Sequence, residues 1–368
     1  MKISCLQENL SKGLQTVSHA VATKAPMPVL GNILMATDDG RLKLAATNLE
    51  TTIVTYVGCA IQEEGGVTVP ARLVKEFVTN LPAGTINLVT ENDTLHIKSD
   101  KTKSKFNGIN IEEFPELPTI TFDDNYVELD PKIFSLTVSL VAFAAGNDDS
   151  RPIFTGVYIK LEEGKLTIVS TDGFRLSEKV ISSQGNAQNF SAVVPAKTLL
   201  EISKIYSGAE QNVKMRINDT GNMVLFHADD TYISSIILDG QYPDYKRIIP
   251  KETVLSAIFT SQDFIEAVKL TNIFAKEANN TIKIRFDPEG KIKINTLSEE
   301  SGEHESEILA EVDGELMEIA VNAKYLLDFL NNVKSEKISV RTSGNVSPCV
   351  FESKDHPEFI HIIMPLQI

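Results

Sequence analysis

The sequence lacks the features that mark secreted, membrane-spanning and zinc-binding proteins. Residues 1–8 contain no apolar run of a signal peptide, and no stretch approaches the roughly 20 apolar residues that cross a bilayer. Only three cysteines occur, Cys5, Cys59 and Cys349, without C-x-x-C spacing, and we interpret all three as buried small side chains. We therefore expect a cytoplasmic protein with no membrane partner.

Signatures of common enzyme classes are also absent. The sequence contains no P-loop, no H-E-x-x-H, no G-x-S-x-G and no EF-hand loop, and its six histidines lack metal-ligand spacing. Asp148, Asp149 and Asp172 could supply paired carboxylates to a hydrolase, although a solvated loop and a turn explain them better. We expect no catalytic residue, no metal and no cofactor.

Net positive charge is missing too. Lys and Arg number 35 against 50 Asp and Glu, which gives a net charge of −15. A protein that binds nucleic acid through its overall charge needs the opposite sign. Any role on DNA must therefore depend on how the charge is distributed.

One module is repeated three times in this chain. A helix-start marker recurs at 69–77 (VPARLVKEF), 194–202 (VPAKTLLEI) and 321–329 (VNAKYLLDF). A second marker, an acid and Gly followed by alternating apolar residues, recurs with nearly the same period at 39–44, 163–168 and 289–294. Two unrelated markers with one period predict three homologous modules, at 1–124, 125–253 and 254–368.

The first marker predicts a helix in each module, with Pro70, Pro195 or Asn322 at or before its first position. A base and an acid four residues apart, such as Lys324 and Asp328, predict an ion pair on the solvent side of each helix. The apolar stripe of these helices predicts a set of core residues: Val74, Phe77, Leu81, Leu199, Ile202, Tyr206, Leu326, Phe329 and Val333.

The second marker predicts a tight turn that leads into a half-buried strand. A further amphipathic helix opens each module, at about 7–23, 131–145 and 262–275. Two helices among many short strands predict an α+β fold, with the helices on one side of antiparallel sheets.

Three runs carry a family resemblance: STDGFRL at 170–176, YPDYKRIIP at 242–250 and MPL at 364–366. In their order and spacing they resemble the bacterial DNA polymerase III β subunit family, the sliding clamps, over the whole chain. The resemblance implies the DNA-clamp fold in a ring-shaped, head-to-tail homodimer that encircles duplex DNA without sequence preference. It also implies a non-catalytic processivity factor that tethers the DNA polymerase III catalytic subunit, the clamp loader and other proteins with a short clamp-binding peptide.

Geometry and charge are compatible with such a ring. Six helices spaced about 10 Å apart on a circle leave a hole of roughly 9 Å, whereas twelve leave roughly 28 Å, enough for duplex DNA. Basic residues number 11 and acidic residues 8 over the six helix spans 7–24, 71–81, 130–145, 196–207, 261–280 and 323–334, while the remainder of the chain is acidic. A mildly basic lining permits weak phosphate contacts and sliding.

The resemblance also assigns site residues. For DNA it implies Lys24, Arg72, Asp148, Pro152 and Ile153, of which only the two cations suit phosphate. It further implies a partner-peptide pocket with apolar walls and two arginines, made of Phe154, Thr171, Gly173, Phe174, Arg175, Leu176, Pro243, Arg247, Ile248, Ile362, Met364, Pro365 and Leu366. The family often has His where this chain has Phe174, and often ends differently from Gln367-Ile368, so the peptide preference is expected to differ.

For the dimer interface, the resemblance implies apolar residues on both sides and complementary charges. The first-module side comprises Phe77, Leu81, Phe106 and the lysines Lys101, Lys103 and Lys105. The third-module side comprises Ile273, Phe274, Glu303 and Glu307. Apart from the resemblance, the repeat is also compatible with an interaction scaffold that has no DNA role, which predicts a monomer or an open assembly.

Overall fold

The computed structural model describes residues 1–22, 27–122, 125–298 and 302–367. The chain divides into two compact units. Unit 1 comprises Met1–Ser135, Gln184–Gln188 and Glu201–Ile237; unit 2 comprises Leu136–Ser183, Asn189–Leu200 and Leu238–Ile368. The second predicted module therefore contributes to both units.

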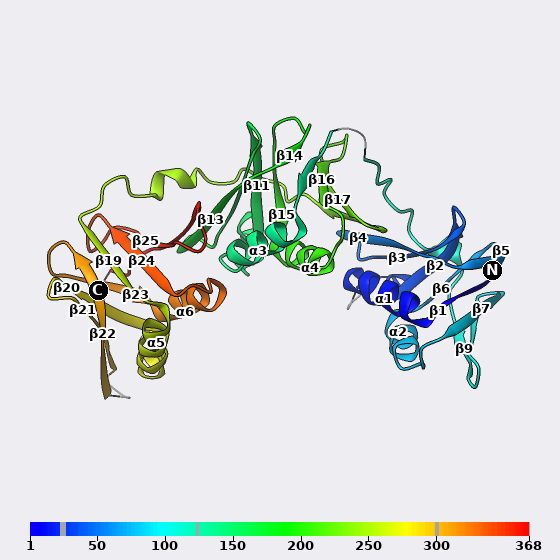
Figure 1. The fold of residues 1–368 in the computed structure, drawn as a ribbon, viewed down its shortest axis with the longest axis horizontal. Coiled ribbons are helices and arrows are strands. Elements are labelled where there is room, and N and C mark those ends of the chain that lie inside the picture. The colour runs from blue at the N-terminus through cyan, green and yellow to red at the C-terminus, as the bar shows by residue number, and fades with distance from the viewer. Residues whose placement is uncertain (23–26, 123–124, 299–301, 368) are drawn as a thin grey trace. The chain divides into compact units, whose positions relative to one another are not determined.

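Antiparallel sheets form the frame of unit 1 (Figure 1). One sheet has the order β5-β1-β7-β8-β9, with bounds Ala60–Glu63, Lys2–Leu6, Thr85–Glu91, Thr94–Lys98 and Lys103–Asn107. The other has the order β14-β10-β16-β17-β18-β4-β3-β2-β6, with bounds Gln184–Gly185, Val127–Leu129, Val213–Ile217, Met223–Ala228, Thr231–Ile236, Thr51–Val57, Arg41–Thr47, Asn32–Asp38 and Gly66–Pro70. The β4–β18 pairing joins the first predicted module to the second in one sheet.

Unit 2 is built on one long sheet with the order β15-β11-β12-β13-β26-β25-β24-β19-β22-β21-β20-β23. The bounds in that order are Phe190–Pro195, Gly156–Glu162, Lys165–Thr171, Arg175–Ser182, Phe359–Ile363, Cys349–Ser353, Lys337–Thr342, Leu255–Thr260, Gly302–Asp313, Lys291–Ser298, Thr281–Asp287 and Met317–Asn322. The β13–β26 pairing repeats, between the second and third modules, the pairing of β4 with β18.

The described residues form two α-helices in each predicted module: α1 (Gln7–Val17), α2 (Ala71–Thr79), α3 (Pro131–Ala142), α4 (Ala196–Tyr206), α5 (Ser261–Ala275) and α6 (Ala323–Asn332). In unit 1, α1 lies beside α2, and in unit 2, α5 lies beside α6 (Figure 1). Asn322 caps α6 through its side chain, which accepts a hydrogen bond from the Lys324 N–H at 2.9 Å. The helix starts predicted from the repeat are confirmed.

Two helices end earlier than predicted. The first stops at Val17, where the Ser18 hydroxyl bonds to the Leu14 carbonyl and a 3-10 turn, η1 (Ser18–Ala20), comes next. The predicted end of this helix, residue 23, lies outside the described residues. The third helix stops at Ala142, because the chain tightens into bonds between residues three apart, as from Ala145 N–H to the Ala142 carbonyl.

The predicted apolar stripe is buried, with one exception. Phe77 is only half-buried. Its neighbour Val78, which was not part of the predicted stripe, is fully buried. The Phe77 ring meets Phe106 edge to face, with centroids 5.2 Å apart. Leu326 and Phe329 of α6, and Val333 directly after it, are all 0% exposed.

The predicted turns are confirmed. Asp39–Gly40 and Glu163–Gly164 are two-residue hairpin loops with both residues at positive φ. The third loop is one residue longer, since Asp287 pairs with Lys291 and leaves three residues between them. Its last residue, Gly290, lies at φ 92°.

Two smaller expectations were wrong. Two of the three helix acids bond to residues other than the base four positions earlier: Glu201 to Lys204 (2.8 Å) and His19 (2.6 Å), and Asp328 to Arg175 (2.6 Å). Cys59 is half-exposed, because it lies just before the exposed edge strand β5, whereas the other two cysteines are buried as predicted.

Candidate functional site

The sequence TDGFR forms a tight turn between β12 and β13. The Thr171 hydroxyl donates to the Arg175 carbonyl (2.6 Å) and accepts from the Gly173 N–H (3.0 Å). One oxygen of Asp172 accepts from the N–H groups of Phe174 (2.9 Å) and Arg175 (3.0 Å). Gly173 lies at φ 94°, where glycine is favoured. The turn is fixed by its own side chains and leaves Phe174 53% exposed.

Arg175 connects this turn to α6. Its side chain is 8% exposed, its Nε donates to Asp172 (3.0 Å) and its Nη1 donates to Asp328 (2.6 Å). The guanidinium also lies over the Tyr325 ring, 4.8 Å from the centroid. Arg175 was predicted to bond a partner peptide, but in this structure two of its nitrogen atoms donate to carboxylates of the same chain.

A cavity of about 260 Å³ opens beside the turn. Three segments line it: the stretch after α3, the turn itself and the start of α6. Its residues are Ala145, Gly146, Asn147, Asp148, Arg151, Phe154, Asp172, Phe174, Arg175, Lys324 and Tyr325. Of the residues predicted for the peptide pocket, the structure brings Phe154, Phe174 and Arg175 together here. Arg151 and Tyr325 were not predicted to belong to the site. Lys324 was named in the sequence analysis only as the base of a predicted ion pair on its helix.

Other predicted pocket residues form the interior behind the turn. Leu176 and Ile362 are paired across β13 and β26 and are 0% exposed. They pack with Val169, Tyr245 and Val350 in one buried cluster. These two residues therefore support the site from behind and do not form an accessible wall, because their positions on the strands point into the sheet's covered face.

The segment 242–250 is held to unit 2 by its tyrosines. Tyr242 stacks on Tyr158 at 4.9 Å between centroids, and the buried Tyr245 donates a hydrogen bond to Glu178. The predicted pocket residues Pro243, Arg247 and Ile248 are exposed beside these anchors, and Arg247 bonds to Asp244 (2.7 Å). They lie outside the lining of the 260 Å³ cavity.

The C-terminal segment, residues 364–366, lies against the turn at 171–175. The Met364 N–H donates to the Phe174 carbonyl (2.9 Å), and the Leu366 N–H donates to the Ala320 carbonyl (2.8 Å). Met364, Pro365 and Leu366 are half-buried. The structure thus brings the end of the chain against the turn through its backbone.

The predicted DNA contacts fall in different environments. Lys24 lies outside the described residues, and Arg72 is exposed in the first turn of α2. Asp148 lies 3.8 Å from Arg151, and hydrogen bonds from Ser150 hold the pKa of its carboxyl below the usual value. Pro152 is exposed at the start of η4 (Pro152–Thr155), and the next residue, Ile153, is half-buried. The Asp148 side chain belongs to the cavity lining described above.

The predicted dimer residues of unit 1 lie on and under an edge strand. Phe106 and Leu81 are buried within the protomer, at 4% and 9% exposure, so that only Phe77 offers apolar surface. The exposed Lys103 begins β9, the edge strand of its sheet. Lys101 and Lys105 are exposed beside it.

In unit 2, Ile273 of α5 is 62% exposed, and Phe274 is half-buried against His304, with stacked rings 5.4 Å apart. Glu303 and Glu307 are exposed on β22. Glu307 also pairs with Lys291 at 2.8 Å. Within the described residues, the 302–309 part of β22 is paired on one side with β21, while its pairing with β19 is confined to 310–313.

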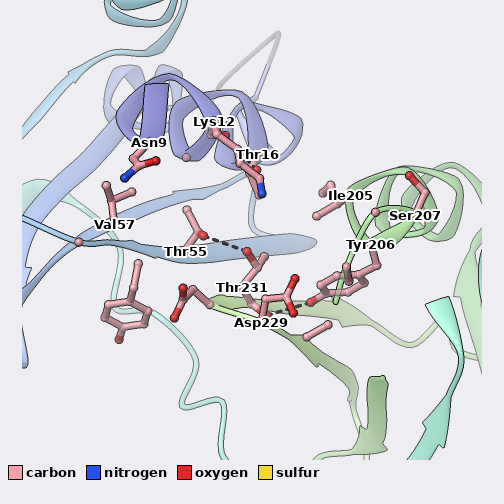
Figure 2. A pocket seen from close by; sticks show the side chains of 17 residues that line it. Asn9, Lys12, Thr16, Thr55, Val57, Ile205, Tyr206, Ser207, Asp229 and Thr231 are labelled. Carbon is pink, nitrogen blue, oxygen red and sulfur yellow. Dashed lines mark hydrogen bonds between the residues drawn. The ribbon is translucent and has the colours of Figure 1, made fainter. Parts of the chain in front are cut away.

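A larger polar cleft of about 530 Å³ was not predicted (Figure 2). It lies in unit 1 between α1, with Asn9 and Lys12, and the end of α4. At its floor, the Thr231 carbonyl accepts from the Tyr206 hydroxyl at 3.1 Å. The lining residues come from four separate stretches of the chain, so no local sequence signal marks it.

The carboxylate-dependent hydrolase considered from the sequence finds no support. Asp172 is bonded to Arg175, and Asp148 to Ser150. Over the parts of the chain that the structure describes, no group of three or more His, Cys, Asp or Glu side chains is placed to hold a metal. Nor does any described helix have the length and apolar character needed to cross a membrane.

Family models match most of this chain. Models of the N-terminal, central and C-terminal domains of the DNA polymerase III beta subunit match residues 1–118, 128–244 and 246–367. This chain belongs to the DNA polymerase III beta subunit family. The resemblance drawn from residues 170–176, 242–250 and 364–366 is confirmed.

Individual family members match over their full lengths. The beta sliding clamp of Synechococcus elongatus is 30% identical over 380 residues, with 100% of both chains covered, and that of Bacillus subtilis is 28% identical with the same coverage. The crystal structure of the Bacillus subtilis sliding clamp has a TM-score of 0.94 at 26% identity, covering 100% of this chain and 99% of the other. The beta subunit from Thermotoga maritima has a TM-score of 0.93 at 26% identity, with the same coverage.

These matches confirm the α+β clamp fold and the interpretation of this family member as a DNA sliding clamp that is not itself catalytic. They favour a partnership with DNA and a DNA polymerase over a scaffold without a DNA role.

Proposed function

We propose that two copies of this chain close into a head-to-tail ring that encircles duplex DNA and tethers the replicative polymerase to it, in the cytoplasm. The full-length match to sliding clamps carries this proposal. Each copy supplies three modules, 1–124, 125–253 and 254–368. Two identical heterologous contacts then complete a closed circle of six modules.

Strand addition closes each contact in this proposal. The edge strand β9 of one copy pairs with the 302–309 part of β22 of the other, so that two unpaired backbone edges satisfy each other. The lysines around β9 then meet the glutamates of β22, which favours this orientation over the alternatives. Phe77, Ile273 and Phe274 supply the apolar part of the interface.

Weak phosphate contacts guide the DNA through the ring. Arg72 is exposed on α2, and Lys24 is the second cation of this set. Pro152 and Ile153 approach the DNA as uncharged loop residues, and Asp148 has its charge offset by Arg151. Because the ring holds DNA by topology, these contacts need no sequence preference and little strength.

The cavity beside turn 171–175 binds the short peptide by which the polymerase catalytic subunit, the clamp loader and other proteins attach. Phe154, Phe174 and Tyr325 offer aromatic surface for apolar anchors. Exposed Arg247 and Ile248, with Met364, extend the site along the peptide. The buried Leu176 and Ile362 hold this surface from behind.

Primer extension tests the tethering. A primed single-stranded circle is copied by the polymerase III catalytic subunit with clamp loader and ATP, and single-encounter product lengths are compared with and without this protein. We expect much longer products with the protein. Phe174→Ala should shorten them, whereas Phe122→Ala, a control at a half-buried residue of unit 1, should leave them long. Unchanged product length with the native protein would refute the proposed function.

A further inference from the structure

The turn at 171–175 has a close copy in the first module. The Thr47 hydroxyl donates to the Thr51 carbonyl (3.2 Å) and accepts from the Leu49 N–H (3.1 Å). One oxygen of Asn48 accepts from the N–H groups of Glu50 (3.0 Å) and Thr51 (2.7 Å). These are the same four bonds that Thr171 and Asp172 make. A threonine followed by an Asn or Asp therefore builds this turn without help from an arginine.

Among the residues in which the two turns differ, the fifth decides the contact with a helix. The position of Arg175 is taken by Thr51 in the first module, and the helix acid equivalent to Asp328 is Glu201. Glu201 bonds to Lys204 and His19, whereas Asp328 accepts from Arg175. The guanidinium of Arg175 thus links the second turn to α6 through Asp328.

This link joins two walls of the 260 Å³ cavity. The turn supplies Asp172 and Phe174 to the lining, and α6 supplies Lys324 and Tyr325. Asp328 lies one helical turn beyond these α6 residues and is not itself part of the lining. Asp328 can therefore affect the cavity only indirectly, by holding Arg175, which does line it, and with Arg175 the distance between the turn and α6.

We propose that the Asp172–Arg175–Asp328 bridge sets the spacing between the turn and α6, and that Arg175 is a positioning residue for peptide binding. The inference rests on the proposed peptide site. Arg175 is 8% exposed, so its charge-assisted bonds lie in a partly dehydrated setting where they hold geometry firmly. Without Asp328, one nitrogen of this guanidinium loses its carboxylate and is drawn toward water, and the turn moves with it.

Binding of a fluorescein-labelled pentapeptide with leucine and phenylalanine anchors tests the bridge in the full-length protein. Asp328→Ala should weaken affinity roughly tenfold, a typical coupling between a cavity and a residue outside it. Asp328→Asn keeps an acceptor oxygen, so its peptide affinity should lie between those of the native protein and Asp328→Ala. Glu201→Ala, the same change at the equivalent position of α4, should bind as the native protein does. Native affinity in Asp328→Ala, or equal weakening by Glu201→Ala, would overturn the proposal.

A second readout separates the bridge from the peptide site. The chain has no tryptophan, so Phe174→Trp introduces a single tryptophan at the turn, whose fluorescence can be excited selectively over that of the tyrosines. Adding Asp328→Ala should lower the fluorescence anisotropy of this tryptophan, and adding Glu201→Ala should not. If the native protein bound no peptide, the proposed peptide site would fail. The anisotropy would then be the test of the bridge, and a value that Asp328→Ala leaves unchanged would refute it.

Discussion

Leu49 occupies, at φ 75°, the turn position that Gly173 occupies at φ 94° in the second module. An L-residue other than glycine in this left-handed region costs about 1–2 kcal/mol. The first turn accepts this cost because Thr47 and Asn48 supply four hydrogen bonds to its backbone. In the second turn, which lies beside the cavity, glycine adopts the same conformation without this strain.

Gly173→Ala should therefore lower the free energy of unfolding by about 1–2 kcal/mol. The loss comes from the backbone and not from a clash, since the nearest heavy atom to an added Cβ is a terminal nitrogen of Arg151 at 3.7 Å. Urea unfolding followed by circular dichroism measures it. Gly31→Ala, at a glycine with open space and no positive φ, is the control and should cost little. Equal effects of the two substitutions would contradict the strain argument.

The contact of Glu201 with His19 and Lys204 should make stability depend on pH. Burial alone would raise the pKa of Glu201, but the hydrogen bonds from Lys204 and His19 outweigh it and hold the pKa below its usual 4.5. A carboxyl whose pKa is lower in the folded state stabilises the fold above the unfolded-state pKa. That contribution is lost as the pH falls through the folded-state value.

Glu201→Gln should therefore cost stability near neutral pH and progressively less as the pH drops below about 4.5. Urea midpoints of native and variant protein across this range give the difference. Glu8→Gln, at an exposed acid of α1, controls for the loss of one negative charge. Curves for native protein and Glu201→Gln that stay parallel at all pH values would show that the ion pairs contribute nothing.

Charge reversal tests the proposed β9–β22 contact. Lys103→Glu should weaken the dimer at low salt, because it places like charges across the interface, and adding Glu303→Lys should restore it. The effect should fade at high salt, since exposed charges are screened. Sedimentation equilibrium at two ionic strengths measures both. Lys354→Glu, on an exposed turn of unit 2, is the matched control; a Lys103 variant no weaker than this control would argue against the contact.

Arg72→Ala should flatten the salt dependence of DNA binding. Each phosphate contact contributes about 0.9 to the slope of log affinity against log salt. Fluorescence anisotropy of a short labelled duplex over a salt series gives that slope. Arg285→Ala removes an exposed arginine from β20 and should leave the slope unchanged. If both variants gave the native slope, Arg72 would have no place in the DNA contact.

Local patterns in the sequence were sufficient for much of the fold. The repeat markers located the turns at Gly40 and Gly164 and the starts of three helices, because each depends on neighbours within a few residues. Prediction failed where side chains compete. Phe77 leaves the buried stripe to meet Phe106, and α1 gives way to a 3-10 turn at Ser18.

The site was only partly predictable. The turn bonds of Thr171 and Asp172 are local, but the run 170–176 was singled out by its family resemblance and not by its turn chemistry. The partner of Arg175, however, is Asp328, 153 residues away, and no local signal reports such a contact. The resemblance placed Leu176 in the pocket but could not show its exposure, which depends on the pairing of β13 with β26 and is 0%.

Retention on DNA circles tests the ring most directly. Protein is loaded by a clamp loader with ATP onto a nicked circular plasmid and, in parallel, onto the same plasmid linearised, and both are washed in high salt. We predict retention on the circle and loss from the linear ends, because topology holds the ring where charge contacts do not. Equal retention on both forms, or loss from both with a loader that works on another clamp, would contradict the ring.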